Sequence, residues 1–491
     1  MSRHVRRLAS DTVVYGLGSV ANQALAILLL PLYTRFLSPA DYGAYALVAS
    51  AGSVLTLVAA LGVNSGLTRI YYLYEDEAQR RSVAFTAFAF AVAMAGATGL
   101  SLVAAAAPLG RLLFDTPEGE GWVRLAVAVY AMSAVNGVCL GTLQVQHRPR
   151  VYVACTVLGL AVSMALSIWL VAHLGRGVHG VLEGQLGGMA VQLGLSTLAV
   201  VTTLRPRWDA RALREMLVFS VPLLPTNVAA WGLALADRWF LKTYAGLADV
   251  GLYALGYRFG AALETLFIAP FTLAWFPYLY SILSQPDHRE VVARILEYYA
   301  LVAATLVLGL ALFSGDVIRL IADPAFHSAD RVVFWIGLGI LFRGMVFITI
   351  TGINVERKNH WSPLVYLPGV AFNVLLLRLL VPAWGTMGAA AATVLTYLAL
   401  NAAFWRVSQR LYPIPYRPVR VLALLGVLLA FELARRFVPS EPWPLALALK
   451  TALLAAFPAS LLALGWLDAG ALERVRALLG LGRPAGGETP G

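Results

Sequence analysis

The sequence predicts an all-α polytopic membrane protein of about fourteen transmembrane helices, arranged as two parallel-repeat six-helix bundles plus two extra C-terminal helices. Three observations predict this fold class. The 491 residues are 59% hydrophobic and only 13% charged, which leaves too little polar surface for a soluble globule of this length. Apolar runs of roughly 20 residues recur along the chain, and each can cross ~30 Å of hydrocarbon. The third observation is an internal repeat.

The repeat is carried by the segment ADYGAYAL, Ala40–Leu47, which returns 208 residues later as ADVGLYAL, Ala248–Leu255, with six of eight positions identical. The same offset places GVHG at 177–180 onto GTMG at 385–388. Because two matches far apart keep one register, the similarity indicates duplication of a large unit and not a chance octapeptide.

Taken in order, the apolar runs predict one helix each, with ends uncertain by a few residues. The predicted spans are 12–34, 43–65, 83–107, 122–143, 151–173, 178–203, 216–241, 251–282, 291–314, 331–353, 361–381, 385–407, 419–437 and 443–465.

The distribution of positive charge predicts the topology. Lys and Arg occur about twice as often at the N-terminus, in the even-numbered loops and in the tail as in the odd-numbered loops. By the positive-inside rule, we expect both termini to be cytoplasmic, in a multi-pass protein of the plasma (inner) membrane. Six spans separate a residue from its repeat partner, so the two halves share one orientation. The predicted parts are an N-terminal lobe 1–208, a C-terminal lobe 209–410, helices 13 and 14 in 411–470, and a cytoplasmic tail 471–491.

Small residues and prolines predict how these helices pack and bend. Prolines in or near the ends of spans 1, 7 and 8 are expected to kink or loosen those helices. They are Pro31, Pro222, Pro225, Pro270 and Pro277. A stripe of small residues on span 6 and its repeat on span 12 is expected to serve close helix contact. It consists of Gly180, Gly184 and Gly188, with Gly388, Ala392 and Thr396 as repeat partners.

The remaining composition excludes several classes of protein. The net charge of +11 comes from basic residues scattered between apolar spans, which does not suggest nucleic-acid binding. Cys139 and Cys155 lie inside apolar spans without ligand spacing, so neither a disulfide framework nor a metal site is indicated. Phosphate-loop, zinc-protease and nucleophile-elbow motifs are missing from the sequence. We therefore expect neither a catalytic residue nor a cofactor, and any transport must draw on a gradient.

Three charged residues are predicted to lie at membrane depth, where charge is costly and usually lines a cavity or forms a pair. Counting from the outer ends of spans 8 and 10 places Arg258 roughly 10 Å, Glu264 roughly 20 Å and Arg343 about 18 Å deep. Glu264 and Arg343 thus occupy similar levels on two helices of one half. Either they pair and hold these helices together, or they face a substrate.

Amides and one arginine complete the set of candidate residues. Asn22 and Gln23 fall near the middle of span 1, and Asn227 lies at a similar level on span 7. Amides there can bind hydroxyl-rich ligands or can bridge helices. Asn64 and Arg69 end span 2 at the cytoplasmic mouth, where the arginine can meet an anionic head group or anchor the helix at the interface.

Two N-terminal stretches carry a family resemblance. LLLPLYTRFLSPADYGAYAL, Leu28–Leu47, and LGVNSGLTRIYYLYED, Leu61–Asp76, resemble the Wzx-type polysaccharide-export flippases of the multidrug/oligosaccharidyl-lipid/polysaccharide superfamily. The repeated halves and the number of spans extend the similarity over the rest of the chain. Neither stretch is a catalytic motif, so the match points to a family more than to a substrate.

The resemblance implies two six-helix lobes around a cationic cavity, which alternately opens to the two sides of the membrane. It implies transfer of an undecaprenyl-pyrophosphate-linked oligosaccharide to the outer leaflet, for O-antigen, capsule or exopolysaccharide synthesis. Cavity arginines in the family handle the pyrophosphate, and the candidates by position are Arg69, Arg258 and Arg343. Implied partners are this polyprenyl-pyrophosphate-linked oligosaccharide, membrane lipids and, transiently, a polysaccharide polymerase and glycosyltransferases.

Three alternatives stay open. A cation-coupled multidrug antiporter would want unpaired carboxylates at the midplane, and Glu264 is the one deep acid that this reading offers. A lipid II flippase would share the fold, although the N-terminal pattern of that family is not matched closely. A membrane glycosyltransferase or ligase would need a large polar loop, and the predicted loops are short.

Overall fold

A computed structural model describes residues 28–466 except 60, 115, 440 and 465, together with the isolated positions 14, 18, 22 and 25. Within these residues the regular structure is helical, and nine helices are long and apolar enough to cross a membrane. The predicted fold class is confirmed. Ten predicted spans correspond to the nine helices, because two of them share the run Trp361–Leu411. The exact number of fourteen stays a prediction, because spans 2, 7 and 13 correspond to helices outside these nine and most of span 1 lies outside the described residues.

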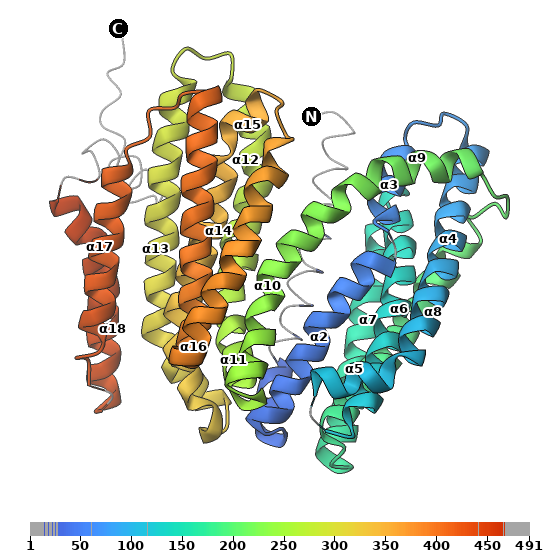
Figure 1. Ribbon diagram of the computed structural model, residues 1–491, viewed down its shortest axis with the longest axis horizontal. Helices are drawn as coiled ribbons and strands as arrows, with labels where there is room; N and C mark the ends of the chain where they lie inside the picture. The colour runs from blue at the N-terminus through green and yellow to red at the C-terminus, as the bar shows by residue number, and fades with distance from the viewer. Residues whose placement is uncertain are drawn as a thin grey trace, which may run out of the picture. The chain divides into compact units, whose positions relative to one another are not determined.

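The chain divides into two units that interleave in sequence. Unit 1 holds the described residues up to Leu255, with Ile318–Ala329 and Ser362–Thr396. Its main helices are α2 (Pro39–Ala59), α3 (Val63–Ile70), α4 (Glu77–Ala104), α5 (Ala106–Leu113), α6 (Gly119–Val145), α7 (Pro149–Ile168), α8 (Gly177–Val201), α9 (Ala210–Ser220), α10 (Leu224–Tyr244) and the start of α11 (Leu247–Leu263), with the π-helical turn η1 (Trp169–His173) after α7 (Figure 1).

Unit 2 holds Gly256–Val317, Asp330–Trp361 and the described residues from Tyr397 onward. Its helices are the rest of α11, the π-helical turn η3 (Glu264–Ile268), α12 (Ala269–Ile282), most of α13 (His288–Ile321), α14 (Asp330–Thr349), α15 (Thr351–Val355), the end of α16 (Trp361–Leu411), α17 (Pro418–Arg435) and α18 (Trp443–Ala463). The predicted lobe boundaries are a separate division of the chain and remain a proposal.

The two copies of the repeated octapeptide pack against each other in unit 1. A Cβ added at Gly43 would lie 1.9 Å from the carbonyl oxygen of Leu247, and one at Gly251 would lie 1.9 Å from that of Pro39. These four positions are two pairs related by the 208-residue offset, so the contact is symmetric. Glycine at both positions allows the backbones at the starts of α2 and α11 to touch.

The second match of the repeat is also visible in the backbone. Gly177 and Gly385 both have φ of +52°, in the region that favours glycine. At Gly385 the run Trp361–Leu411 breaks into two helices, and Gly388 then packs on the backbone of Leu380. The two spans predicted on either side of this glycine are therefore two helices that meet at a kink.

The small-residue stripe has the predicted packing role. On α8, Gly184 and Gly188 lie against Ser167 and Ser163 of α7, where a Cβ would come within 2.3 Å of those side chains. In the second half this device changes, because the repeat partner of Gly188 is Thr396, whose hydroxyl accepts a 2.9 Å hydrogen bond from the Asn373 amide. One repeat closes its helix contact with glycine and the other with a buried hydrogen bond.

Helices are interrupted near three of the five prolines, Pro222, Pro225 and Pro270, whereas Pro31 and Pro277 lie within unbroken helix. Before Pro225, α9 ends at Ser220 and a 3₁₀ turn spans Val221–Leu223, which includes Pro222. In the next span the π-helical turn Glu264–Ile268 stands just before Pro270. Both interruptions follow from the missing proline N–H and the clash of the ring with the preceding turn.

Helices α17 and α18 are fixed to α13 by polar contacts spread along that helix. Arg420 on α17 pairs with the buried Glu297 at 3.2 Å, and Lys450 on α18 pairs with Asp316 at 2.6 Å. Arg435 donates a 3.1 Å hydrogen bond to the carbonyl oxygen of Ala311. The two C-terminal helices are therefore an integral part of unit 2.

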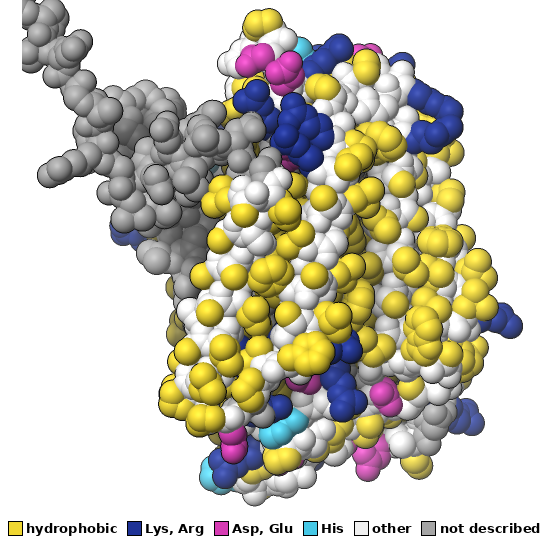
Figure 2. Space-filling model, turned by 90° about the vertical axis from the view of Figure 1, so that its left-hand side faces the viewer, with side chains coloured by type: hydrophobic (Ala, Val, Ile, Leu, Met, Phe, Trp, Pro, Cys, Tyr) yellow, Lys and Arg dark blue, Asp and Glu magenta, His cyan; other side chains and the backbone are white. Residues whose placement is uncertain are grey.

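The outer surface suits a lipid environment. Figure 2 shows hydrophobic side chains spread over the middle of one face, with Lys, Arg, Asp and Glu gathered mainly toward its upper and lower ends. On α17 and α18 and the segment between them, large apolar side chains are well exposed, including Val419, Leu422, Leu433, Phe437 and Trp443. Apolar exposure on this scale is stable in hydrocarbon and unfavourable in water.

Candidate functional site

Glu264 and Arg343 form an ion pair in unit 2, and each residue lies away from the ends of a candidate membrane span. Glu264 opens η3, about 26 Å along the candidate span Leu247–Ile282 from its first residue. Arg343 lies on α14 within the candidate span Pro324–Val355. The predicted pairing is present. The two side chains nevertheless keep 34% and 29% of their surface exposed, so the pair is not sealed inside the unit.

A cluster of aromatic rings from α13, η3 and α12 packs close to this pair. The Tyr299 hydroxyl donates a 3.1 Å hydrogen bond to the carbonyl oxygen of Leu341, two residues before Arg343. The Tyr299 ring lies 5.4 Å from that of Phe267 and 4.9 Å from that of Phe271. These contacts fix α13 and the η3–α12 segment beside α14. The π-helical turn shifts the register of the helix where the carboxylate projects, a feature frequent at functional sites.

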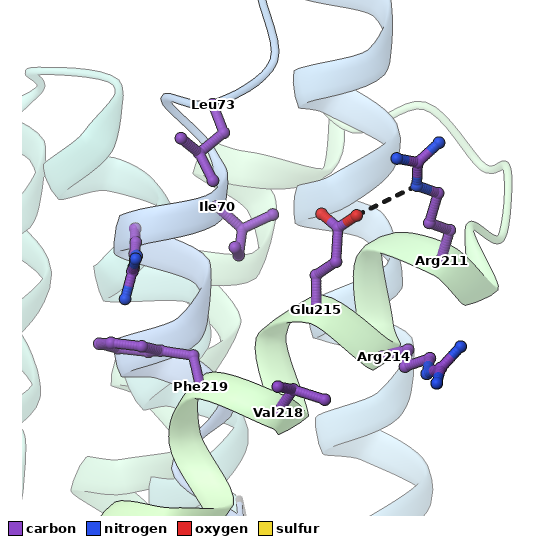
Figure 3. A pocket seen from close by; sticks show the side chains of 8 residues that line it. Ile70, Leu73, Arg211, Arg214, Glu215, Val218 and Phe219 are labelled. Carbon is purple, nitrogen blue, oxygen red and sulfur yellow. Dashed lines mark hydrogen bonds and ion pairs between the residues drawn. The ribbon is translucent and has the colours of Figure 1, made fainter.

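A second candidate is a basic groove in unit 1, which we call the α3–α9 groove. Its volume is about 570 Å³. Figure 3 shows side chains from α3 and the turn after it on one side, and side chains from α9 on the other. The lining residues are Arg69, Ile70, Leu73, Arg211, Arg214, Glu215, Val218 and Phe219.

The charges in the groove are arranged unequally. The Arg69 guanidinium lies over the Phe219 ring, 4.5 Å from its centre. Arg211 pairs with Glu215 at 3.1 Å, and the Tyr74 hydroxyl donates a 3.5 Å hydrogen bond to the same carboxylate. Burial, with the negative charge of Glu215, raises the pKa of Tyr74 above its usual value, so this hydroxyl stays a donor at neutral pH.

Close packing fixes the two helices that build the groove. A Cβ at Gly66 would lie 2.8 Å from the backbone oxygen of Met216, so glycine lets α3 and α9 approach. The Asp209 carboxylate caps α9 by accepting a 3.0 Å hydrogen bond from the Ala212 N–H. The Asp209 N–H donates in turn to the Thr86 hydroxyl of α4 at 2.9 Å.

Arg69 was predicted from the sequence, whereas the α9 side of the groove was missed. The arginines of this helix lie between the predicted spans 178–203 and 216–241, and they served only as part of the positive charge that predicts the topology. The helical spacing of its residues was the available signal, because the charged and the buried positions fall on opposite faces. Arg211, Arg214, Glu215 and Val218 line the groove, whereas Ala212, Met216 and Ser220 are buried.

The other predicted residues are placed separately. The Asn22 amide donates a 3.2 Å hydrogen bond to the Thr156 hydroxyl of α7, which is the helix-bridging alternative. Asn64 lies on α3 with its amide oxygen against α6, where a Cβ at Gly141 would come within 2.0 Å of it. Arg258 is half-buried on α11 in unit 2.

Two predicted residues cannot be placed in a site. Gln23 lies outside the described residues, and Asn227 belongs to α10 with its side chain outside the described part. Their expected contact with hydroxyl-rich ligands therefore stays a prediction.

Comparison with known proteins identifies the family. A family model described as "Polysaccharide biosynthesis protein" matches residues 32–329, which include the first copy of the repeated octapeptide, the α3–α9 groove and Glu264. The chain belongs to the polysaccharide biosynthesis protein family. The match begins within the first stretch that carried the resemblance and covers more than half of the sequence.

Two relatives of this family member are named for transport. The "Lipid III flippase" of Escherichia coli (strain K12) is 23% identical over 402 residues, covering 79% of this chain and 93% of the relative. The "Succinoglycan biosynthesis transport protein ExoT" of Rhizobium meliloti (strain 1021) is 24% identical over 239 residues, covering 48% of this chain and 46% of the relative.

Solved structures share the fold of this family member. The "Lipid II flippase MurJ, inward closed conformation" superposes with a TM-score of 0.69 at 12% identity, covering 91% of this chain and 98% of that one. An inward-facing multidrug resistance MATE family transporter of the MOP superfamily gives 0.65 at 15% identity, covering 82% and 96%. The chain therefore has the fold of these two solved structures, with nine candidate membrane spans among its described residues.

Proposed function

We propose that the chain moves an oligosaccharide linked to a polyprenyl diphosphate from the cytoplasmic to the outer leaflet of the inner membrane, for polysaccharide synthesis, by alternating access with both termini cytoplasmic. The observation that carries the proposal is the Arg343 side chain, which keeps 29% of its surface exposed within a membrane span. An arginine is costly at this depth unless it faces water or an anion. A diphosphate is an anion that its forked N–H groups can hold bidentately.

The pairing with Glu264 gives this arginine a resting state. Without substrate, the carboxylate neutralises the guanidinium. An arriving diphosphate carries more negative charge and can replace Glu264, and the carboxylate then favours release by returning. Because the exchange replaces one anion with another, the cost of leaving a charge unpaired at membrane depth is avoided.

The proposal separates this chain from a drug exporter in one respect. A cation exporter needs a carboxylate that is available to its ligand, whereas Glu264 is engaged by Arg343. The similarity to the MATE transporter concerns the fold alone. Transient contacts with a polysaccharide polymerase and glycosyltransferases belong to the same proposal.

Transport in reconstituted vesicles tests it. A polyprenyl diphosphate carrying a fluorescent oligosaccharide is placed in liposomes, and an impermeant quencher reports the fraction in the outer leaflet. We expect Arg343→Ala to abolish transfer and Arg331→Ala, an equal loss of charge at the exposed start of the same helix, to preserve it. Equal rates in wild type, Arg343→Ala and empty liposomes would refute the proposal, and uptake of a cationic dye instead would favour the antiporter.

A further inference from the structure

A small pocket lies in unit 2 between the start of α13 and the connector that leads into α17, and we call it the α13–α17 pocket. Its volume is about 120 Å³. Four lining residues lie on one face of α13, because they are spaced three, four and seven residues from the first, and two belong to the connector. They are Glu290, Ala293, Arg294, Glu297, Pro415 and Arg417. None of them belongs to the Glu264–Arg343 pair or lines the α3–α9 groove.

Polar contacts fix both walls of this pocket. The Tyr416 hydroxyl, next to Arg417, donates a 3.0 Å hydrogen bond to the carbonyl oxygen of Ile348 and so ties the connector to α14. The ion pair between Arg420 and Glu297 ties the start of α17 to α13. Because the walls are already held in place, little ordering is needed when a ligand binds.

The charges of the α13–α17 pocket are only partly paired. Glu297 is engaged by Arg420 at 3.2 Å, and its side chain is only 9% exposed. Glu290 and Arg294 lie 3.9 Å apart and are both exposed, and an ion pair of this kind contributes little. Within the part of the chain that the structure describes, Arg417 forms no ion pair. One carboxylate and two guanidinium groups therefore remain available to a ligand.

This mixture of charges selects for a ligand that carries both signs. Two carboxylates line the pocket and oppose a ligand with several negative charges, such as a diphosphate, whereas two guanidinium groups oppose a simple cation. Guanidinium groups hold a phosphate ester through charged hydrogen bonds, and a carboxylate accepts hydrogen bonds from a primary ammonium group. The lining therefore favours a zwitterion that has one phosphate and one ammonium group.

An apolar surface continues from the pocket along the membrane span. Every fourth residue of α13 after Arg294 is a large side chain with between 40% and 43% of its surface exposed, in the order Tyr298, Val302 and Leu306. Residues four apart lie on one face of a helix, so these side chains follow Arg294 in a single stripe. On α17 the exposed Val419 and Leu422 come directly after the pocket residue Arg417. A charged pocket at the end of such a surface matches a lipid, whose chains cover the stripe.

We propose that the α13–α17 pocket binds the head group of one phosphatidylethanolamine molecule at the end of unit 2 predicted to be cytoplasmic. Arg294 and Arg417 hold the lipid phosphate, Glu290 accepts hydrogen bonds from the ammonium group, and the acyl chains lie along the α13 stripe. The lipid bridges α13 and the connector, and it thereby holds the start of α17. It differs from the transported lipid, so the inference does not rest on the proposed function.

Lipid binding to the purified full chain tests the site. Native mass spectrometry from a neutral detergent measures dissociation constants for phosphatidylethanolamine, phosphatidylcholine and phosphatidylglycerol with identical acyl chains. We expect phosphatidylethanolamine to bind most tightly, because phosphatidylcholine has no ammonium N–H group and phosphatidylglycerol has no ammonium group. Glu290→Gln should weaken phosphatidylethanolamine roughly tenfold, as expected for loss of a charged hydrogen bond, and should not weaken phosphatidylglycerol. Arg417→Ala should weaken both lipids, because both carry the phosphate.

Two variants at the same end of unit 2 are matched controls. Glu356→Gln and Arg410→Ala remove the same charges from exposed residues that do not line the pocket. Equal affinities for Glu290→Gln and Glu356→Gln would overturn the ammonium contact, and equal affinities for Arg417→Ala and Arg410→Ala would overturn the phosphate contact. Equal binding of all three lipids to wild type would show unselective lipid and overturn the site. Displacement of the lipid by an equal concentration of free phosphoethanolamine would overturn the role of the α13 stripe.

Thermal unfolding gives a second measurement of the same binding. Phosphatidylethanolamine added to the detergent should raise the unfolding temperature of wild type, because a ligand that binds the folded state stabilises it. The double variant Glu290→Gln with Arg417→Ala should unfold like wild type without lipid, since both side chains are exposed, and should gain nothing from the lipid. An equal rise in both proteins would contradict the proposal. Neither measurement involves transport, so this inference and the proposed function can fail separately.

Discussion

The contact between Gly43 and Gly251 makes a quantitative prediction for the Gly251→Ala variant. The new Cβ would lie 1.9 Å from the Pro39 carbonyl oxygen. A carbon and an oxygen in comfortable contact are about 3.3 Å apart, so the starts of α2 and α11 must separate by about 1.4 Å. Backbone cannot rotate away as a side chain does. We expect a loss of about 1–3 kcal/mol in the free energy of unfolding, as for other overpacked sites.

The pair of glycines allows a test of the mechanism as well as of the magnitude. Gly43→Ala meets the Leu247 carbonyl oxygen at the same distance and should cost a similar amount. Because one separation of the helices relieves both clashes, the double variant should lose clearly less than the sum of the single losses. Thermal unfolding in a fixed detergent measures all three variants against wild type.

A matched control comes from a helical glycine in open space. A Cβ at Gly194 on α8 would have nothing within 4 Å. Gly194→Ala should be neutral or should stabilise by up to about 1 kcal/mol through helix propensity. If Gly251→Ala unfolded at the same temperature as Gly194→Ala, or if the two repeat variants were strictly additive, the symmetric contact would be refuted.

Three further predictions concern single contacts. Glu264→Gln leaves Arg343 without its anion and should lower the free energy of unfolding of unit 2 by about 1–2 kcal/mol, a loss kept small by the partial exposure of the pair. The double variant Glu264→Leu with Arg343→Met should unfold at nearly the wild-type temperature and yet transport nothing. Thermal unfolding and the vesicle assay together check both variants. Glu297→Gln weakens the hold on Arg420 and should cost about 1–3 kcal/mol, seen as faster hydrogen exchange in α17, and unchanged exchange there would contradict it. In Gly177→Ala the new Cβ would have no atom within 4 Å, so the variant should lose about 1–2 kcal/mol of the free energy of unfolding through its positive φ alone. Unfolding at the wild-type temperature would contradict this prediction.

Sequence reasoning predicted the features that depend on pattern. Apolar runs predicted helices, and the repeat aligned Gly177 with Gly385, two glycines that the structure shows with the same positive φ. Counting residues along helices placed Glu264 and Arg343 at similar depth, which was sufficient for the pairing to be considered. Counting could not distinguish a buried pair from a partly exposed one, since exposure depends on helix rotation and neighbouring helices.

The α3–α9 groove shows where such reasoning stops. Arg211 and Arg214 read as topology signals because positive charge in a cytoplasmic loop needs no further explanation. Their role as groove residues depends on the approach of α9 to α3 at Gly66, a contact across about 150 residues of sequence that no local pattern encodes. The position of the Arg69 guanidinium over the Phe219 ring follows from the same approach.

The two halves of the chain therefore use their common origin in different ways. Where repeat partners meet, as at Gly43 and Gly251, the contact is symmetric and needs the same residue twice. The ionic residues break this symmetry, because the positions 208 residues before Glu264 and Arg343 are Thr56 and Val135, neither of which carries charge. Duplication accounts for the helices that the two halves share. The charged residues proposed to contact one anionic ligand are needed in only one half. We therefore expect substitution of repeat-equivalent glycines by alanine to lower stability in either half. Substrate selectivity should instead depend on the charged residues that the two halves do not share.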